Sequence, residues 1–145
     1  MNTLQFSIII NSPKEKVWST MLEQETFKVW TEAFAEGSYY EGFWNKGERI
    51  KFLAPDGDGM TSIIAENKPF EFISIKHLCI IKDGVEDTES PESKSWAAAF
   101  ENYTFQERDG ATELKVDADV PPEFEDYMNS AWPKALARVK GICEM

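Results

Sequence analysis

The chain has 145 residues, of which 42% are hydrophobic and 28% are charged. It is therefore long enough to fold as a domain with a sizeable core, and it is not expected to be disordered. Fifteen basic residues against 26 acidic ones give a formal net charge of −11, which argues against binding to DNA, RNA or anionic membranes, because each needs a cationic patch.

No repeat, charge block or linker divides the sequence, so residues 1–145 are expected to form a single domain. Apolar residues alternate with polar ones over 4–10, which predicts a first strand. The Ser12-Pro13-Lys14-Glu15 motif predicts a helix start, with its serine as the N-cap and its glutamate completing a capping box. Residues 17–22 give that helix an apolar face, and Thr26–Phe34 has the apolar stripe of a second helix.

From Ser38 the apolar period changes to two, which predicts six strands separated by tight turns. The expected strands are Ser38–Phe43, Glu48–Ala54, Met60–Asn67, Phe70–Ile81, Trp96–Glu107 and Thr112–Val120. The acidic stretch Asp83–Ser95 is interpreted as a solvated loop, with a gate over a cavity as the alternative. The turn Asp56-Gly57-Asp58-Gly59 is interpreted as a plain β-turn rather than a calcium or phosphate loop, because it is too short for the former and lacks the lysine of the latter.

The spacing returns to helical after Pro121-Pro122, and a long apolar stripe over 124–143 predicts a C-terminal helix. Pro133 interrupts this stripe, and we expect Ser130 to cap a second helical segment with the proline in its first turn. An antiparallel sheet needs a cover, which this helix is long enough to give. The predicted class is α+β, with a curved antiparallel sheet wrapped around a long C-terminal helix and two short helices after the first strand.

This order of elements resembles the START-like superfamily, also called helix-grip or SRPBCC. Two motifs at the ends of the chain carry the resemblance: Ser12-Pro13-x-x-x-Val17-Trp18 and Trp132-Pro133-x-x-Leu136-x-x-x-Lys140. Three further stretches are similar to the branch homologous to the C-terminal domain of the activator of Hsp90 ATPase: Gly42-x-Trp44-x-x-Gly47, Gly57-x-Gly59-Met60 and His77-Leu78-x-Ile80-x-x-Asp83-Gly84.

The resemblance covers essentially the whole chain. It implies the helix-grip fold and a cavity between the concave sheet and the long helix. It does not imply one activity, because the superfamily includes lipid carriers, cyclases and hydrolases.

The register of one hairpin predicts a carboxylate on the core face of the sheet. A two-residue turn at Asp109-Gly110 pairs Glu101 with Ala118 and Tyr103 with Val116. The apolar residues of the last strand must point inward, and their partners Glu101 and Tyr103 then point inward as well. Glu101 either reaches solvent at a bulge or at the sheet rim, or lies in the cavity and anchors a ligand.

His77 is the only histidine, and the alternation of its strand turns it inward. It is interpreted as a hydrogen-bonded core residue or, if Glu101 also faces the cavity, as half of an acid–base pair. No serine or cysteine nucleophile is visibly partnered with it, and one histidine cannot form a histidine-based metal cluster.

Cys79 and Cys143 lie in apolar surroundings and are predicted to be buried free thiols. The sequence shows no signal peptide and no apolar run long enough to cross a bilayer. We therefore expect a cytoplasmic protein, and we expect neither a metal nor a cofactor.

The leading hypothesis is a module that binds a small apolar or amphipathic ligand, neutral or cationic in view of the acidic composition. The residues expected to line the cavity are Phe52, Ile75, His77, Glu101, Tyr103, Leu114, Trp132 and Leu136.

Two alternatives remain open: an Hsp90 co-chaperone-like interaction protein, and an enzyme that uses Glu101 or His77 as a base. The sequence contains no nucleophile motif, metal cluster or cofactor fingerprint, so no catalytic residue is assigned and an enzyme is the less favoured expectation. A homodimer formed through an edge strand or through Trp44 is also open.

Overall fold

One antiparallel sheet forms the body of the fold, with its main strands in the order β1-β8-β7-β5-β4-β3-β2 and with β6 paired to β5. The computed structural model describes residues 1–145. The strands are β1 (Asn2–Ile10), β2 (Tyr39–Gly42), β3 (Arg49–Leu53), β4 (Gly59–Lys68), β5 (Phe72–Lys82), β6 (Val85–Asp87), β7 (Phe100–Arg108) and β8 (Ala111–Val120).

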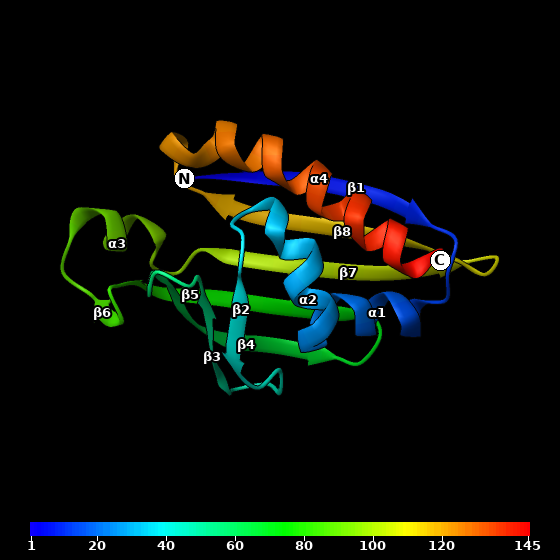
Figure 1. Cartoon of the computed structure of the whole chain (residues 1–145), viewed down its shortest axis with the longest axis horizontal. Coiled ribbons are helices and arrows are strands. Elements are labelled where there is room, and N and C mark those ends of the chain that lie inside the picture. Colours follow the sequence, from blue (N-terminus) through cyan, green and yellow to red (C-terminus); the bar gives the residue numbers. More distant parts are fainter.

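Three of the four α-helices lie across one face of this sheet, where the long C-terminal helix packs beside β1 (Figure 1). The α-helices are α1 (Lys14–Leu22), α2 (Gln24–Trp30), α3 (Pro91–Trp96) and α4 (Glu125–Cys143), and short 3₁₀ turns cover Thr31–Ala33 and Pro122–Phe124. This arrangement confirms the predicted α+β helix-grip fold. None of the helices combines the length and the apolar character that a membrane span requires.

The hairpin of β7 and β8 has the predicted register. Asp109 and Gly110 both have positive φ angles, 54° and 81°, as a type I′ turn requires. Glu101 therefore pairs with Ala118 and Tyr103 with Val116. Because Ala118 and Val116 are buried on the helix-covered face, this register carries Glu101 and Tyr103 to the same face.

The predicted helix caps are wrong at both ends of the chain. Pro13, not Ser12, is the N-cap of α1, and no side chain caps it. Ser12 is instead buried, and its carbonyl accepts a hydrogen bond from the Thr112 hydroxyl. At the other end α4 runs without a break through Pro133, so Ser130 caps nothing. Trp132 and its apolar neighbours are buried, and this packing offsets the one backbone hydrogen bond that the proline removes.

The acidic segment before β7 is also more structured than predicted. Within 83–95, β6 pairs with β5 and α3 follows it, so Trp96 ends a helix and the next strand begins only at Phe100. The signal for this helix is Ser90-Pro91, where the serine side chain accepts from the Ser93 amide and the proline takes the first helical position. The other strands agree with their predicted bounds to within two residues.

A bulge in β5 separates two residues that simple alternation places on one face. Ser62 pairs with His77 and Thr61 pairs with Cys79, so Leu78 has no partner in the ladder. His77 and Cys79 consequently lie on opposite faces of the sheet. Cys79 is buried and free, as predicted, but its sulfur lies 3.6 Å from a carboxylate oxygen of Glu86 rather than in the main core.

Candidate ligand-binding cavity

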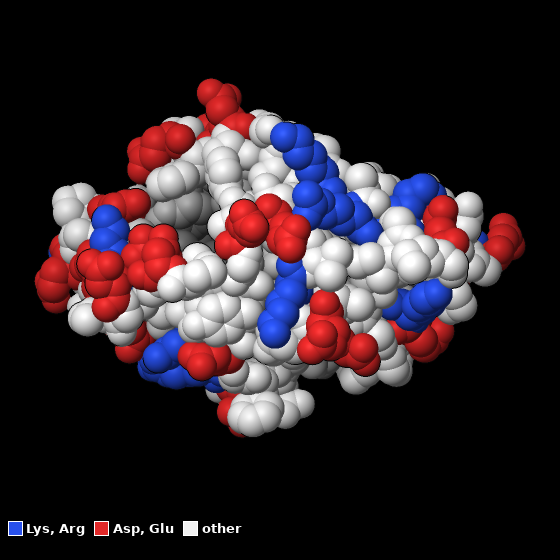
Figure 2. Space-filling model, in the orientation of Figure 1, with Lys and Arg blue, Asp and Glu red and all other residues white.

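A cavity of about 440 Å³ opens between the sheet, α2, α3 and the first half of α4. Figure 2 shows its recess between the parts of the surface that α3 and the start of α4 occupy in Figure 1. Twenty residues line it and 13 of them are hydrophobic. Both the volume and the apolar character fall in the range of small-molecule sites in proteins.

Eight aromatic residues line the cavity. They come from α2 and the turn after it, from β2, β3 and β7, and from α3 and α4: Phe27, Trp30, Phe34, Tyr39, Phe52, Trp96, Tyr103 and Trp132. The rings of Trp30 and Trp132 have their centroids 5.9 Å apart, and both side chains are almost fully buried. Trp132 also packs edge-on against Phe34 at 4.9 Å. These mutual contacts hold the rings in place, so the wall is preformed.

Four polar side chains from adjacent strands form a chain of contacts beside the cavity. The Ser62 hydroxyl lies 2.7 Å from Nδ1 of His77. On the other side of the imidazole, Nε2 lies 3.5 Å from Oε1 of Glu101. The Tyr103 hydroxyl donates a hydrogen bond to Oε2 of the same carboxylate. Three of the four, all but Ser62, border the cavity directly.

The buried end of this chain determines the tautomer of the histidine. Ser62 is fully buried and its hydroxyl has no hydrogen-bond partner other than Nδ1 of His77. The hydroxyl therefore donates to Nδ1, because otherwise its proton would be buried without an acceptor. The neutral ring then carries its proton on Nε2, where it points toward Glu101.

Tyr103 stays protonated at the other end. Burial raises the pKa of its phenol well above the ordinary value of 10.0, and the charge of Glu101 and the hydrogen bond to it act in the same direction. Glu101 thus faces two donors, the phenol and the imidazole N–H, and its side chain is 22% exposed. Glu101 lies on the cavity wall, one of the two positions considered from the sequence.

The turn between β3 and β4 borders the cavity and is tied to the turn between β5 and β6. Asp56 and Asp58 belong to the tight turn between β3 and β4 and both border the cavity. An Asp58 carboxylate oxygen accepts from the Asp83 amide at 3.1 Å, and the carbonyl of Gly57 accepts from the Gly84 amide at 2.9 Å. These hydrogen bonds hold the β3–β4 turn in position at the edge of the cavity.

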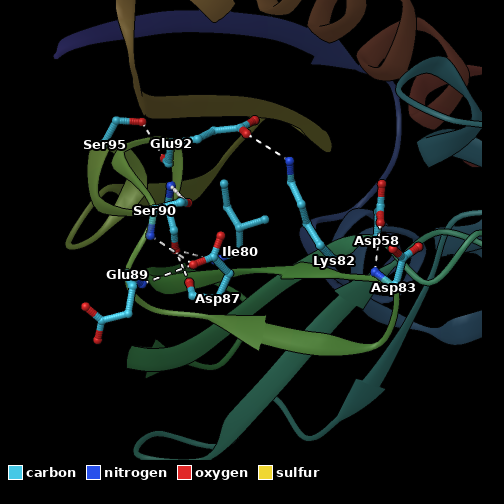
Figure 3. Close-up of polar contacts among 10 residues, drawn as sticks. Asp58, Ile80, Lys82, Asp83, Asp87, Glu89, Ser90, Glu92 and Ser95 are labelled. Carbon is cyan, nitrogen blue, oxygen red and sulfur yellow. Dashed lines mark hydrogen bonds and ion pairs between the residues drawn. The ribbon is translucent and has the colours of Figure 1, made fainter.

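The segment that carries α3 is anchored to the sheet by side chains (Figure 3). Asp87 accepts from the amides of Glu89 and Ser90, and its hydrogen bonds with Ser90 lower its pKa most. Lys82 forms an ion pair with Glu92 at 3.1 Å. These contacts place α3 at the edge of the cavity, with the Trp96 ring 6.2 Å from the His77 ring.

Five of the eight residues expected to line the cavity border it: Phe52, His77, Glu101, Tyr103 and Trp132. The other three, Ile75, Leu114 and Leu136, are buried in the surrounding core and do not border it. Whether any of the eight contacts a ligand stays a prediction. The residues missed include Trp30 and Phe34, which lie in the stretch predicted as the apolar stripe of the second helix. Trp44, considered from the sequence as a dimer contact, packs on Tyr40 and donates its indole N–H to the carbonyl of Leu22.

No family model matches the sequence, and no curated protein matches it either. Among solved structures, the fold is similar to the Aha1 dimer from Colwellia psychrerythraea, with a TM-score of 0.75, 18% identity, and coverage of 100% of this chain and 98% of that one. Protein MLL2253 from Mesorhizobium loti has a TM-score of 0.75 and 14% identity, covering 99% of this chain and 97% of its own.

DynU16, a protein from the dynemicin biosynthetic locus, has a TM-score of 0.71 and 12% identity over 100% of this chain. The present chain covers 48% of DynU16, about half of its length. At these identities the similarities show the fold alone, which is the helix-grip fold described above.

Proposed function

We propose that this protein binds a small, largely apolar molecule in the cavity between the sheet and α4. The observation that carries the proposal is the cavity itself, about 440 Å³ with a preformed aromatic wall and a few polar groups on one side. Removal of apolar ligand surface from water supplies most of the affinity. Glu101, His77 and Tyr103 orient the ligand.

The comparisons support a binding module of this fold without naming its ligand. We place the chain in the branch homologous to the C-terminal domain of the activator of Hsp90 ATPase. The motifs around Trp44, Gly59 and His77 support this placement, as does the similarity to the Colwellia Aha1 protein. We also propose a cytoplasmic location, because the reducing conditions there keep free thiols such as its two cysteines reduced.

Native mass spectrometry of protein purified gently from its own host tests the proposal directly. A discrete adduct that disappears on denaturation would establish ligand binding and give the mass of the ligand. A neutral dye such as Nile red adds a second test with purified protein. We expect its fluorescence to shift to the blue on binding in the apolar cavity.

Met128→Trp places a larger side chain at the cavity wall and is expected to weaken dye binding by about tenfold or more. Met145→Trp is the matched control, because the same substitution then falls on a residue that is 96% exposed at the C-terminus. Equal dye binding by the two variants would contradict the location of the site.

A second candidate function is general acid–base chemistry on the bound molecule. The specific observation that favours it is the pair of His77 and Glu101 at 3.5 Å on the cavity wall, with Ser62 fixing the tautomer of the imidazole. Any ligand recovered from the protein can be incubated with it and its mass followed over time. A conversion that is lost in both His77→Gln and Glu101→Gln would support this function, and an unchanged ligand mass would count against it.

We also propose that two copies pair through an open sheet edge. β2 lies at one edge of the sheet, and Phe43, directly after it, is 67% exposed. The solved Colwellia protein, described as a dimer, supports this assembly. Sedimentation velocity should show a dimer that Phe43→Ser shifts toward the monomer. A monomer over the whole range of protein concentrations would rule the pairing out.

A further inference from the structure

The Asp, Glu, Lys and Arg side chains that line the cavity are all acidic. Among its 20 lining residues are three carboxylates, Asp56, Asp58 and Glu101, and neither a lysine nor an arginine. Figure 2 shows more acidic side chains on the surface around the recess, and the whole chain has a formal net charge of −11. The potential inside such a recess is negative, because low-dielectric walls concentrate the field of the carboxylates.

Glu101 is the least exposed of the three carboxylates, and no lysine or arginine forms an ion pair with it. Oε2 accepts from the Tyr103 hydroxyl, but Oε1 lies 3.5 Å from Nε2 of His77, beyond the usual length of a hydrogen bond. A carboxylate can accept about four hydrogen bonds, so Oε1 retains acceptor capacity. Its side chain is only 22% exposed, and a largely buried carboxylate is costly unless a cation or several donors approach it.

The aromatic wall complements such a cation. Tyr103 and Trp132 pack against each other with ring centroids 6.0 Å apart, next to the carboxylate. Ring faces attract ammonium groups, most strongly where water is excluded. The same rings offer apolar surface to the remainder of a ligand. One end of the cavity therefore suits a positive charge, and the rest suits a hydrocarbon or aromatic body.

We infer that the ligand of this cavity is a cationic amphiphile, an organic amine whose ammonium group is held by the carboxylate of Glu101 and whose apolar body lies against the aromatic wall. This inference rests on the proposed binding function and goes beyond it by naming the charge of the ligand. A carboxylate ligand, such as a fatty acid, meets repulsion in the same cavity. A neutral alcohol can hydrogen-bond to Glu101 but gains no charge attraction.

Three probes of one chain length test the inference: octylamine, 1-octanol and octanoate, titrated at pH 7 by isothermal calorimetry. We expect octylamine to bind at least about tenfold more tightly than 1-octanol, the low end of what a hydrogen bond between charged groups supplies. Octanoate should bind most weakly of the three. This comparison needs no variant, so it decides the preferred charge even if a substitution impairs folding.

Glu101→Gln keeps the size of the side chain and an acceptor for Tyr103 but removes the charge. We expect it to reduce octylamine binding to about the level of 1-octanol, and to affect 1-octanol binding far less than octylamine binding. Glu113→Gln is the matched control, because its side chain is similarly exposed at 20% and lies away from the cavity beside Arg108 and Lys115. It should retain the full preference for the amine.

Equal binding of octylamine and 1-octanol by the unaltered protein would overturn the inference and leave the proposed function standing. An amine preference that survives Glu101→Gln would overturn the assignment of Glu101 as the anchor. Failure of all three probes to bind would contradict the proposed function together with the inference.

Discussion

The two ends of the helix-covered face of the sheet are built from different side chains, although the same strands run through both. Along β7 the inward positions are Glu101, Tyr103 and Phe105. Phe105 packs on Trp18 of α1 with ring centroids 5.2 Å apart, at the end of the sheet that α1 covers in Figure 1. Glu101 borders the cavity at the other end.

The end away from the cavity, called the filled end here, includes deeply buried aliphatic residues of β8 and α4. Leu114, Leu136 and Val139 are 0–1% exposed there and do not border the aromatic-walled cavity. The open end has rigid rings, which pack edge to face, and two polar pairs joined by hydrogen bonds, Ser62 with His77 and Tyr103 with Glu101. The cavity therefore lies at the end of the sheet that is built from aromatic rings and polar side chains.

The largest expected effect is on stability, at the filled end. Leu136→Ala removes a side chain that is 1% exposed and should lower the free energy of unfolding by about 2–5 kcal/mol. Met128→Ala, on the same helix at the half-buried cavity wall, should lower it by less than about 1 kcal/mol. Urea denaturation measures both. Similar losses in the two variants would mean that the two ends do not differ in packing.

A smaller effect is expected from the buried hydroxyl that orients the histidine. Ser62→Ala should cost about 1–2 kcal/mol, because Nδ1 of His77 loses its donor. Without this donor, the neutral imidazole of His77 is no longer held in one tautomer. Nitrogen-15 NMR of the neutral ring should show the proton on Nε2 in the unaltered protein and a mixture of tautomers in the variant. A proton on Nδ1 in the unaltered protein would contradict the proposed direction of this hydrogen bond.

The buried phenol should make the open end sensitive to alkali. The pKa of Tyr103 is raised in the folded protein, so the stability linked to it is fully present below the ordinary value of 10.0. It is lost as the pH rises through the higher pKa of the folded state. Stability should therefore fall more steeply above about pH 10 in the unaltered protein than in Tyr103→Phe. Parallel curves of unfolding free energy against pH would exclude this linkage.

The smallest expected effect concerns the thiol on the opposite face of the sheet. Burial and the charge of Glu86 raise the pKa of Cys79, whereas Cys143 is raised chiefly by its own burial among α1 and α4 residues. Glu86→Gln should therefore speed alkylation of Cys79 a few-fold and leave Cys143 unchanged. Peptide mass spectrometry after iodoacetamide treatment distinguishes the two sites. Equal acceleration at both would indicate general loosening of the structure.

The sequence was sufficient where a local turn determines a long-range register. Asp109-Gly110 predicted every pair of the β7–β8 hairpin used to place Glu101 and Tyr103, because a two-residue turn leaves no freedom in the pairing. Helix N-caps were harder to predict from the sequence. Ser-Pro occurs at both Ser12 and Ser90, but only Ser90 caps a helix. Burial of Ser12 against β8, a tertiary contact, decides between them.

The cavity wall was predictable only in part. The bulge at Leu78 leaves no clear signal in the sequence, and it decides that His77 and Cys79 lie on different faces. The contribution of Trp30 depends on where α2 lies against the sheet, which hydrophobic periodicity does not specify. Ile75 was expected to line the cavity but is buried in the surrounding core, because a residue on the inward face of the sheet need not border the cavity.

The five tryptophans allow one direct measurement of whether the open end is the binding site. Trp30, Trp96 and Trp132 border the cavity, whereas Trp18 and Trp44 do not. In a titration with octylamine followed by ¹H–¹⁵N NMR, the indole signals of the first three should shift together and saturate, and those of the other two should move little. Shifts confined to Trp18 and Trp44, or no shift in any of the five, would contradict a binding site for an apolar amine at this end of the sheet.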